Sequence, residues 1–73
     1  MRQYNFSKNL KKYRKEKNMS QAELAVGIRV TQQTISAWET DERYPTLDKV
    51  YDIAKILDIP VNKLLTEENL PYM

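Results

Sequence analysis

Residues 31–39, Thr-Gln-Gln-Thr-Ile-Ser-Ala-Trp-Glu, are the stretch whose residue types most clearly suggest binding chemistry. Ile35 and Trp38 are three positions apart, so both face the same way on a helix that turns about 100° per residue. The opposite face then carries short, uncharged side chains, most of which donate and accept hydrogen bonds: Gln33, Ser36, Ala37 and Thr40. Because the other helix faces of this chain carry Lys and Glu, this uncharged face is predicted to contact a ligand.

Two adjacent glutamines, Gln32 and Gln33, stand at the start of this predicted helix. A carboxamide can form two hydrogen bonds with the N6/N7 edge of adenine in the major groove. The pair therefore makes DNA reading the leading hypothesis. Trp38 is expected in the core rather than stacked on a base, since its spacing from Ile35 turns it inward.

The composition excludes several classes of function. The chain has no cysteine and no histidine, which excludes disulfides, the usual zinc sites and histidine-based acid–base catalysis. It has no glycine-rich phosphate loop and no carboxylate pair that the pattern buries, so we expect no enzyme, no cofactor and no metal. No apolar run approaches the roughly 20 residues of a membrane span. Residues 1–4 begin no signal peptide, so a cytoplasmic protein without a membrane partner is expected.

Charge is distributed unevenly along the chain, although the net charge is only +2. Residues 1–17 have a net charge of +6 and residues 18–73 a net charge of −4. Such asymmetry favours the approach of one end to a polyanion. The alternative is a solvated helix face that happens to be basic, and the sequence does not separate the two.

Hydrophobic spacing and capping residues predict five helices. The first spans about residues 5–17, and Ser20 with Glu23 forms a capping box that opens the second. Thr31 caps the third, Thr46 the fourth, and Pro60 begins a short fifth. The apolar stripe of the fourth helix is predicted to be Leu47, Val50, Ile53, Ala54 and Leu57, and that of the fifth Val61, Leu64 and Leu65.

Only about three residues separate the second and third predicted helices. Such a short connection prevents an antiparallel arrangement, so the two helices must cross steeply as a helix-turn-helix. The sequence thus predicts an all-α, compact five-helix domain over residues 1–66, followed by a tail at residues 67–73. Leu64, Leu65, Leu70 and Tyr72 are either packed within the monomer or form a dimer contact.

At this point the chain resembles the Cro/phage-repressor (Xre) helix-turn-helix family and is similar to the N-terminal domains of lambdoid phage repressors. The resemblance covers Leu10 to Leu64. It rests on Leu10-x-x-Tyr13-Arg14, Met19-Ser20-Gln21-x-x-Leu24-Ala25, Val30-Thr31-x-x-Thr34-Ile35-Ser36-x-Trp38-Glu39, Arg43-x-Pro45-Thr46 and Ile53-Ala54-x-x-Leu57-x-Ile59. It implies a lambda-repressor-like fold and a sequence-specific regulator of transcription, expected to act as a repressor.

The resemblance also implies roles for individual residues. Base edges are expected to meet Gln32, Gln33, Ser36 and Ala37, and the DNA backbone to meet Gln21, Thr31, Thr40 and Arg43. Arg14 and Glu39 match a partly buried ion pair of the family. The expected partner is double-stranded DNA with a near-palindromic operator, bound by a homodimer whose seam is the fifth helix and the tail.

The chain departs from the family pattern at several turns. Positions that often carry glycine in a left-handed conformation hold Asn18, Arg29, Asp41 and Asp58. Arg29 would bear a penalty of roughly 1–2 kcal/mol if its φ is positive, unless Gly27 relieves the turn instead. Glu42 replaces a common basic residue, which should weaken a backbone contact. The rival hypothesis is a protein-interaction module, such as an antitoxin or accessory regulator, whose main partner is a protein.

Overall fold

The computed structural model describes residues 5–65, which form five helices and no strand. The predicted all-α, five-helix domain is therefore confirmed. Residues 67–73 of the predicted tail, with Leu70 and Tyr72, lie outside the described residues. Within residues 5–65 no helix has the length and apolar character needed to cross a bilayer. The helices are α1 (Phe6–Glu16), α2 (Gln21–Ile28), α3 (Gln32–Glu39), α4 (Leu47–Leu57) and α5 (Val61–Leu65).

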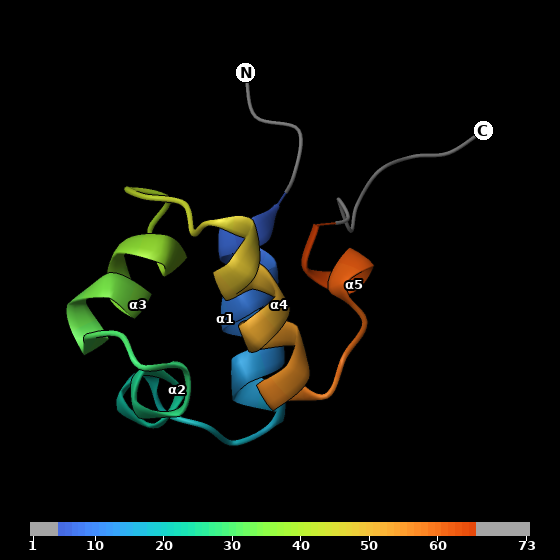
Figure 1. Cartoon of the computed structure of the whole chain (residues 1–73), viewed down its shortest axis with the longest axis horizontal. Helices are drawn as coiled ribbons and strands as arrows, with labels where there is room; N and C mark the ends of the chain where they lie inside the picture. The colour runs from blue at the N-terminus through green and yellow to red at the C-terminus, as the bar shows by residue number, and fades with distance from the viewer. Residues whose placement is uncertain (1–4, 66–73) are drawn as a thin grey trace.

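The core lies between α1 and α4, which occupy the middle of the molecule, with α2 and α3 on one side and α5 on the other (Figure 1). Helix α3 packs against both α1 and α2, and α2 also packs against α4. The helix-turn-helix is thus attached to a scaffold of the remaining helices. The buried apolar residues are Phe6, Leu10, Leu24, Ala25, Ile28, Ile35, Trp38, Val50, Ile53, Ala54, Leu57 and Leu64.

Helix starts follow the predicted capping chemistry. The Ser20 hydroxyl oxygen accepts from the N–H of Glu23 at 3.0 Å, and the Glu23 carboxylate accepts from the N–H of Ser20 at 2.8 Å. Thr31 caps α3 and Thr46 caps α4 in the same way, each through a hydroxyl oxygen. These contacts satisfy donors that the first turn of a helix otherwise leaves without a partner.

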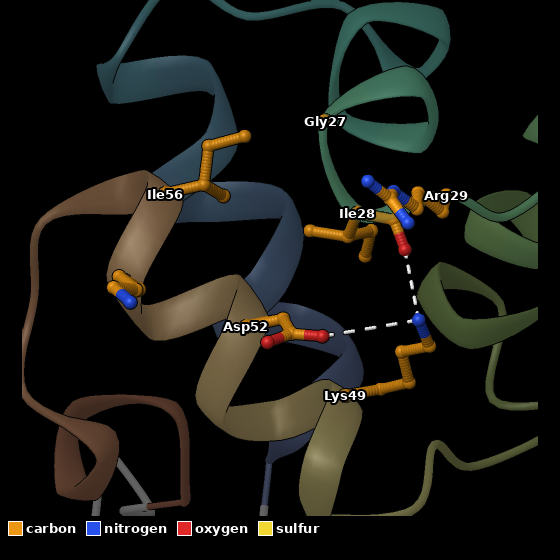
Figure 2. A pocket seen from close by; sticks show the side chains of 7 residues that line it. Gly27, Ile28, Arg29, Lys49, Asp52 and Ile56 are labelled. Carbon is orange, nitrogen blue, oxygen red and sulfur yellow. Dashed lines mark hydrogen bonds and ion pairs between the residues drawn. The ribbon is translucent and has the colours of Figure 1, made fainter.

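All four departures from glycine adopt the left-handed conformation. Asn18, Arg29, Asp41 and Asp58 have φ values of 56°, 63°, 70° and 57°. Arg29 therefore bears the penalty, and Gly27 does not relieve it because its φ is not positive. Gly27 serves a different purpose: a Cβ there would collide with Ile56 Cδ1 where α2 approaches α4 (Figure 2).

The predicted apolar stripe of α4 is wrong at one residue, Leu47. Val50, Ile53, Ala54 and Leu57 are buried as predicted, but Leu47 is 60% exposed. The periodicity does place Leu47 at the edge of the buried stripe. It is, however, the first residue of α4, and its side chain is not covered by the rest of the protein. Helical spacing alone reports direction and not whether a neighbour is present.

Helix α5 is fastened to the N-terminal half of the chain by a buried polar contact. Asn9, on α1, donates its side-chain N–H to the carbonyl oxygen of Leu64 at 3.0 Å. Leu64 itself is fully buried in the core, whereas Val61 and Leu65 are partly buried against it. Of the two alternatives for Leu64, packing within the monomer is therefore correct.

Candidate nucleic-acid interface

Helix α3 is held by its inner face. Ile35 is fully buried and Trp38 is 4% exposed, so both residues belong to the core as the spacing predicts. Burying two such large side chains contributes roughly 1.5–3 kcal/mol each. An eight-residue helix is marginal alone in water, so this packing is what keeps α3 helical.

The outer face of α3 presents the uncharged side chains predicted to contact a ligand. Gln32 and Gln33 are exposed, and Ser36 and Ala37 are half-buried on the same face. One open hollow is lined by Gln21 of α2 together with Gln32, Gln33 and Ser36 of α3. The predicted base-reading residues thus lie together and are accessible from one side.

Gln21 connects this outer face to the interior. Its side-chain nitrogen donates to Glu39 Oε1 at 3.0 Å, and its oxygen accepts from Gln32 Nε2 at 3.5 Å. An ionised carboxylate only accepts hydrogen bonds, so Glu39 fixes which end of the Gln21 amide faces inward. The oxygen of Gln21 is then the end that Gln32 meets.

Arg14 and Glu39 form a buried ion pair at the C-terminal end of α3. Arg14 Nε donates to Glu39 Oε2 at 2.6 Å and Nη2 donates to Oε1 at 3.1 Å, a bidentate arrangement. Arg14 Nη1 also donates to the carbonyl oxygen of Met19 at 2.7 Å. One guanidinium therefore joins α1, the connection to α2, and α3. The two residues are 8% and 7% exposed.

The predicted backbone-contact residues flank α3 at both ends. Thr31 is exposed, and its hydroxyl is already hydrogen-bonded within the cap, to the N–H and the hydroxyl of Thr34. Thr40 is exposed and donates its hydroxyl back to the carbonyl oxygens of Ser36 and Ala37. Arg43 lies exposed in the following loop, next to the acidic Glu42.

Sequence reasoning missed two long-range contacts of this region. The first joins Gln21 to Glu39, and the second joins Asp41 to Ser7, while Tyr44, three residues further on, donates to the same Asp41 oxygen. The unusual aspartate at a left-handed position was the one visible sign of the second contact. The basic face of α1 is exposed as expected, and its part in binding a polyanion stays a prediction. Its exposed lysines are Lys8, Lys11, Lys12, Lys15 and Lys17.

Curated relatives of this chain are regulators of transcription by their names. The transcriptional activator BcrR of Enterococcus faecalis is 32% identical over 89% of this chain and 32% of BcrR. The uncharacterized regulator YqaE of Bacillus subtilis is 36% identical over 88% of this chain and 55% of YqaE. The phage CTXphi repressor RstR of Vibrio cholerae is 32% identical over 85% of this chain and 56% of RstR. The chain thus spans from about a third to just over half the length of these relatives.

Solved structures with the same fold include two proteins bound to DNA. The biofilm regulator SinR, in complex with DNA, has a TM-score of 0.76 and 30% identity, covering 81% of this chain and 95% of SinR. The P22 c2 repressor, in complex with a synthetic operator, has a TM-score of 0.77 and 27% identity, covering 82% of this chain and 91% of the repressor.

The fold also occurs as a part of an enzyme. Hydroxypropylphosphonic acid epoxidase from S. wedmorenis has a TM-score of 0.77 and 33% identity, over 82% of this chain but 32% of the epoxidase. The model of the helix-turn-helix family matches residues 10–64. That match covers most of the chain and includes α2, α3 and the loop that carries Arg43. The chain belongs to the Cro/phage-repressor (Xre-type) helix-turn-helix family.

Proposed function

We propose that this chain binds double-stranded DNA in a sequence-specific manner and regulates transcription. The observation that carries the proposal is the two-sided character of α3. Its inner face is fixed by Ile35, Trp38 and the Arg14–Glu39 pair, while its outer face offers two exposed carboxamides. A rigid helix with short hydrogen-bonding side chains on its free face suits the major groove.

The mechanism follows from the geometry of the helix-turn-helix. Helix α3 would enter the major groove and α2 would lie across the backbone. Gln32, Gln33, Ser36 and Ala37 would meet base edges. The flanking residues would meet phosphates: Gln21, Thr31, Thr40 and Arg43. Since one amide donor of Gln21 is already directed at Glu39, its contact with a phosphate would use the other donor or the start of α2.

Repression is the mode of regulation that we propose. A domain of this size can block a promoter simply by occupying it, with no further activity. We also propose that the chain is not an enzyme. Its curated relatives are regulators of transcription, and the epoxidase resembles it over only a third of the enzyme's length. We propose that the protein is cytoplasmic and is associated with the nucleoid when it is bound to DNA.

A homodimer on a near-palindromic operator is the second part of the proposal. One small domain contacts few base pairs, so useful specificity at physiological salt requires two copies. Leu64 cannot contribute to the seam, because it is buried in its own core. Among residues 5–65 the exposed large apolar side chains are Val26, Tyr44, Leu47 and Tyr51, and the last three surround the start of α4.

Helix α4 also has the charges that a two-fold seam needs. Asp48 and Lys55 lie three residues before and four residues after Tyr51. If two α4 helices crossed antiparallel at Tyr51, each Asp48 would lie near Lys55 of the second copy. A two-fold interface must be self-complementary in this way. We therefore propose that Leu47 and Tyr51 contact a second copy of this chain.

DNA binding is tested by a gel shift on a duplex that the wild-type protein selects from a random pool. The affinity should fall steeply as salt rises. Gln33→Ala should lose preference for the selected duplex over a scrambled one. Lys63→Ala, on α5 at the opposite side of the molecule from α3, should keep it. Equal affinity of Gln33→Ala for both duplexes supports the proposal, and an unchanged preference contradicts it.

The seam is tested by sedimentation equilibrium of the wild type and Tyr51→Lys, with and without the selected duplex. The wild type should form a dimer on DNA, and Tyr51→Lys should bind as a monomer with unchanged melting temperature. A dimer that persists in Tyr51→Lys would place the seam elsewhere. Recovery of one stoichiometric protein partner by an α3 variant that binds no DNA would favour the rival interaction module.

A further inference from the structure

The turn that follows α3 is held by the side chain of its own left-handed residue. Asp41 Oδ1 accepts a hydrogen bond from the Tyr44 hydroxyl at 2.7 Å and another from the Ser7 hydroxyl at 3.0 Å. Ser7 lies in the first turn of α1, so the contact closes 34 residues of chain. We call this set of three residues, Ser7, Asp41 and Tyr44, the Asp41 clasp.

The left-handed backbone admits an aspartate here but does not require one, because asparagine and glycine adopt the same conformation. With φ at 70°, glycine would adopt the conformation without strain. What aspartate adds is a carboxylate oxygen that accepts from two hydroxyl groups at once. Helix α1, moreover, starts without a side-chain cap and without an acidic residue in its first turn. Asp41 brings a negative charge to that end, where the helix dipole favours one.

Arg43 lies between the two loop residues of the clasp. On one side the N–H groups of Glu42 and Arg43 both donate to the carbonyl oxygen of Ala37, which ties them to the end of α3. On the other side Tyr44 is tied to Asp41, and through Asp41 to α1. The backbone of Arg43 is therefore restrained from both directions, although its side chain is exposed.

We propose that Asp41 is a positioning residue for DNA binding: the clasp holds the loop so that Arg43 reaches a phosphate. The inference rests on the proposed function, since it needs a DNA backbone for Arg43 to contact. Asp41 itself makes no contact with DNA in this account. Its charge would repel phosphates if it acted directly, so the sign of its effect separates a positioning role from a purely electrostatic one.

The test compares Asp41→Gly, Arg43→Ala and the double variant by measuring the dissociation constant for the selected duplex over a range of salt concentrations. Loss of one phosphate contact should lower the slope of affinity against salt by about 1. Asp41→Gly and Arg43→Ala should each show this loss together with a several-fold weaker affinity. The double variant should show no further loss, because both changes remove the same contact.

Three further measurements exclude a merely structural role. The melting temperature of Asp41→Gly should stay within a few degrees of the wild type, because both lost hydrogen bonds are exposed and glycine adopts the left-handed conformation without strain. Asp41→Asn keeps a carbonyl oxygen as acceptor and should recover most of the affinity. Tyr44→Phe with Ser7→Ala should reproduce the altered salt slope, since it removes the two hydroxyl donors of the clasp and leaves the carboxylate in place.

Several outcomes would overturn the proposal. Tighter binding by Asp41→Gly would show that the charge acts by repulsion. Additive losses in the double variant, or a melting temperature that falls in parallel with affinity, would show a structural role. A wild-type slope retained by Asp41→Gly would refute the clasp while leaving DNA binding intact. Absence of salt-dependent binding by the wild type would instead overturn the proposed function, and the clasp's role with it.

Discussion

The two turns that flank α3 share a left-handed backbone conformation and are braced in different ways. Arg29, before the helix, and Asp41, after it, are both non-glycine residues with φ above 60°. The first turn is braced from outside: Lys49 Nζ, on α4, donates to the carbonyl oxygen of Ile28 at 2.8 Å (Figure 2). The second turn is braced by the carboxylate of the left-handed residue itself.

The comparison shows that two turns can share a backbone conformation while their side chains play different parts. At Arg29 the brace acts on the main chain, and the arginine side chain lies exposed beside an open hollow that Lys49 and Ile56 also line. At Asp41 the side chain is the brace. Removing the Arg29 side chain should therefore cause no loss of stability. Removing the Asp41 side chain should disturb the loop that carries Arg43.

The largest effect is expected from Arg14→Ala, which tests whether α3 is fixed independently of both turns. Removing one partner of a buried ion pair costs about 3–5 kcal/mol, whereas a whole domain is stable by about 5–15 kcal/mol. We expect the melting temperature to fall by more than about 10 °C, since 1 kcal/mol corresponds to roughly 4–8 °C in a domain of this size. Lys15→Ala, at the exposed neighbouring position, is the control. A loss of only a few degrees in Arg14→Ala would show that the turns and the core hold α3 without the pair.

A smaller effect is expected from Lys49→Met, which removes the outside brace of the first turn. Hydrogen bonds to charged groups are worth about 1.5–3 kcal/mol, and partial exposure of the Lys49 side chain reduces this to about 1 kcal/mol. Thermal denaturation should show a loss of several degrees. Lys11→Met, on the exposed face of α1, should leave the melting temperature unchanged. Equal melting temperatures for both variants would show that Lys49 does not stabilise the turn.

The smallest effect, and the one of opposite sign, is expected from Arg29→Gly. Relief of about 1–2 kcal/mol of left-handed strain exceeds the roughly 0.5–1 kcal/mol that glycine costs through the unfolded state. The melting temperature should rise by a few degrees. Lys17→Gly is the matched control, because Lys17 ends α1 with φ at −90° and gains no relief. That control should be slightly destabilised, and a rise in both variants would contradict the account.

Much of the fold could be predicted because local chemistry determines it. The capping box at Ser20 and Glu23, the caps at Thr31 and Thr46, and the buried Ile35 and Trp38 all follow from residues within one helical turn of each other. Leu47 was predicted wrongly for the complementary reason. Its direction on α4 is local, but its exposure depends on whether another part of the protein covers the end of the helix.

In the candidate site, too, local features could be predicted from the sequence and long-range contacts could not. The exposed, uncharged face of α3 was evident from spacing alone, and the DNA contacts assigned to it stay predictions. The contacts that Gln21 makes with Glu39 and that Asp41 makes with Ser7 join residues 18 and 34 positions apart. Side-chain hydrogen bonds of that range leave no period in the sequence. They are therefore found only once the helices have been placed.

The sequence of the selected DNA shows whether α3 reads bases. Wild-type protein and Gln33→Ala would each select duplexes from the same random pool. We expect the wild type to select a two-fold symmetric site with half-site centres about one helical turn apart. We expect Gln33→Ala to lose its preference at the same base pair in both half-sites. Identical sites for the two proteins, or no shared site for the wild type, would contradict the claim that α3 reads DNA.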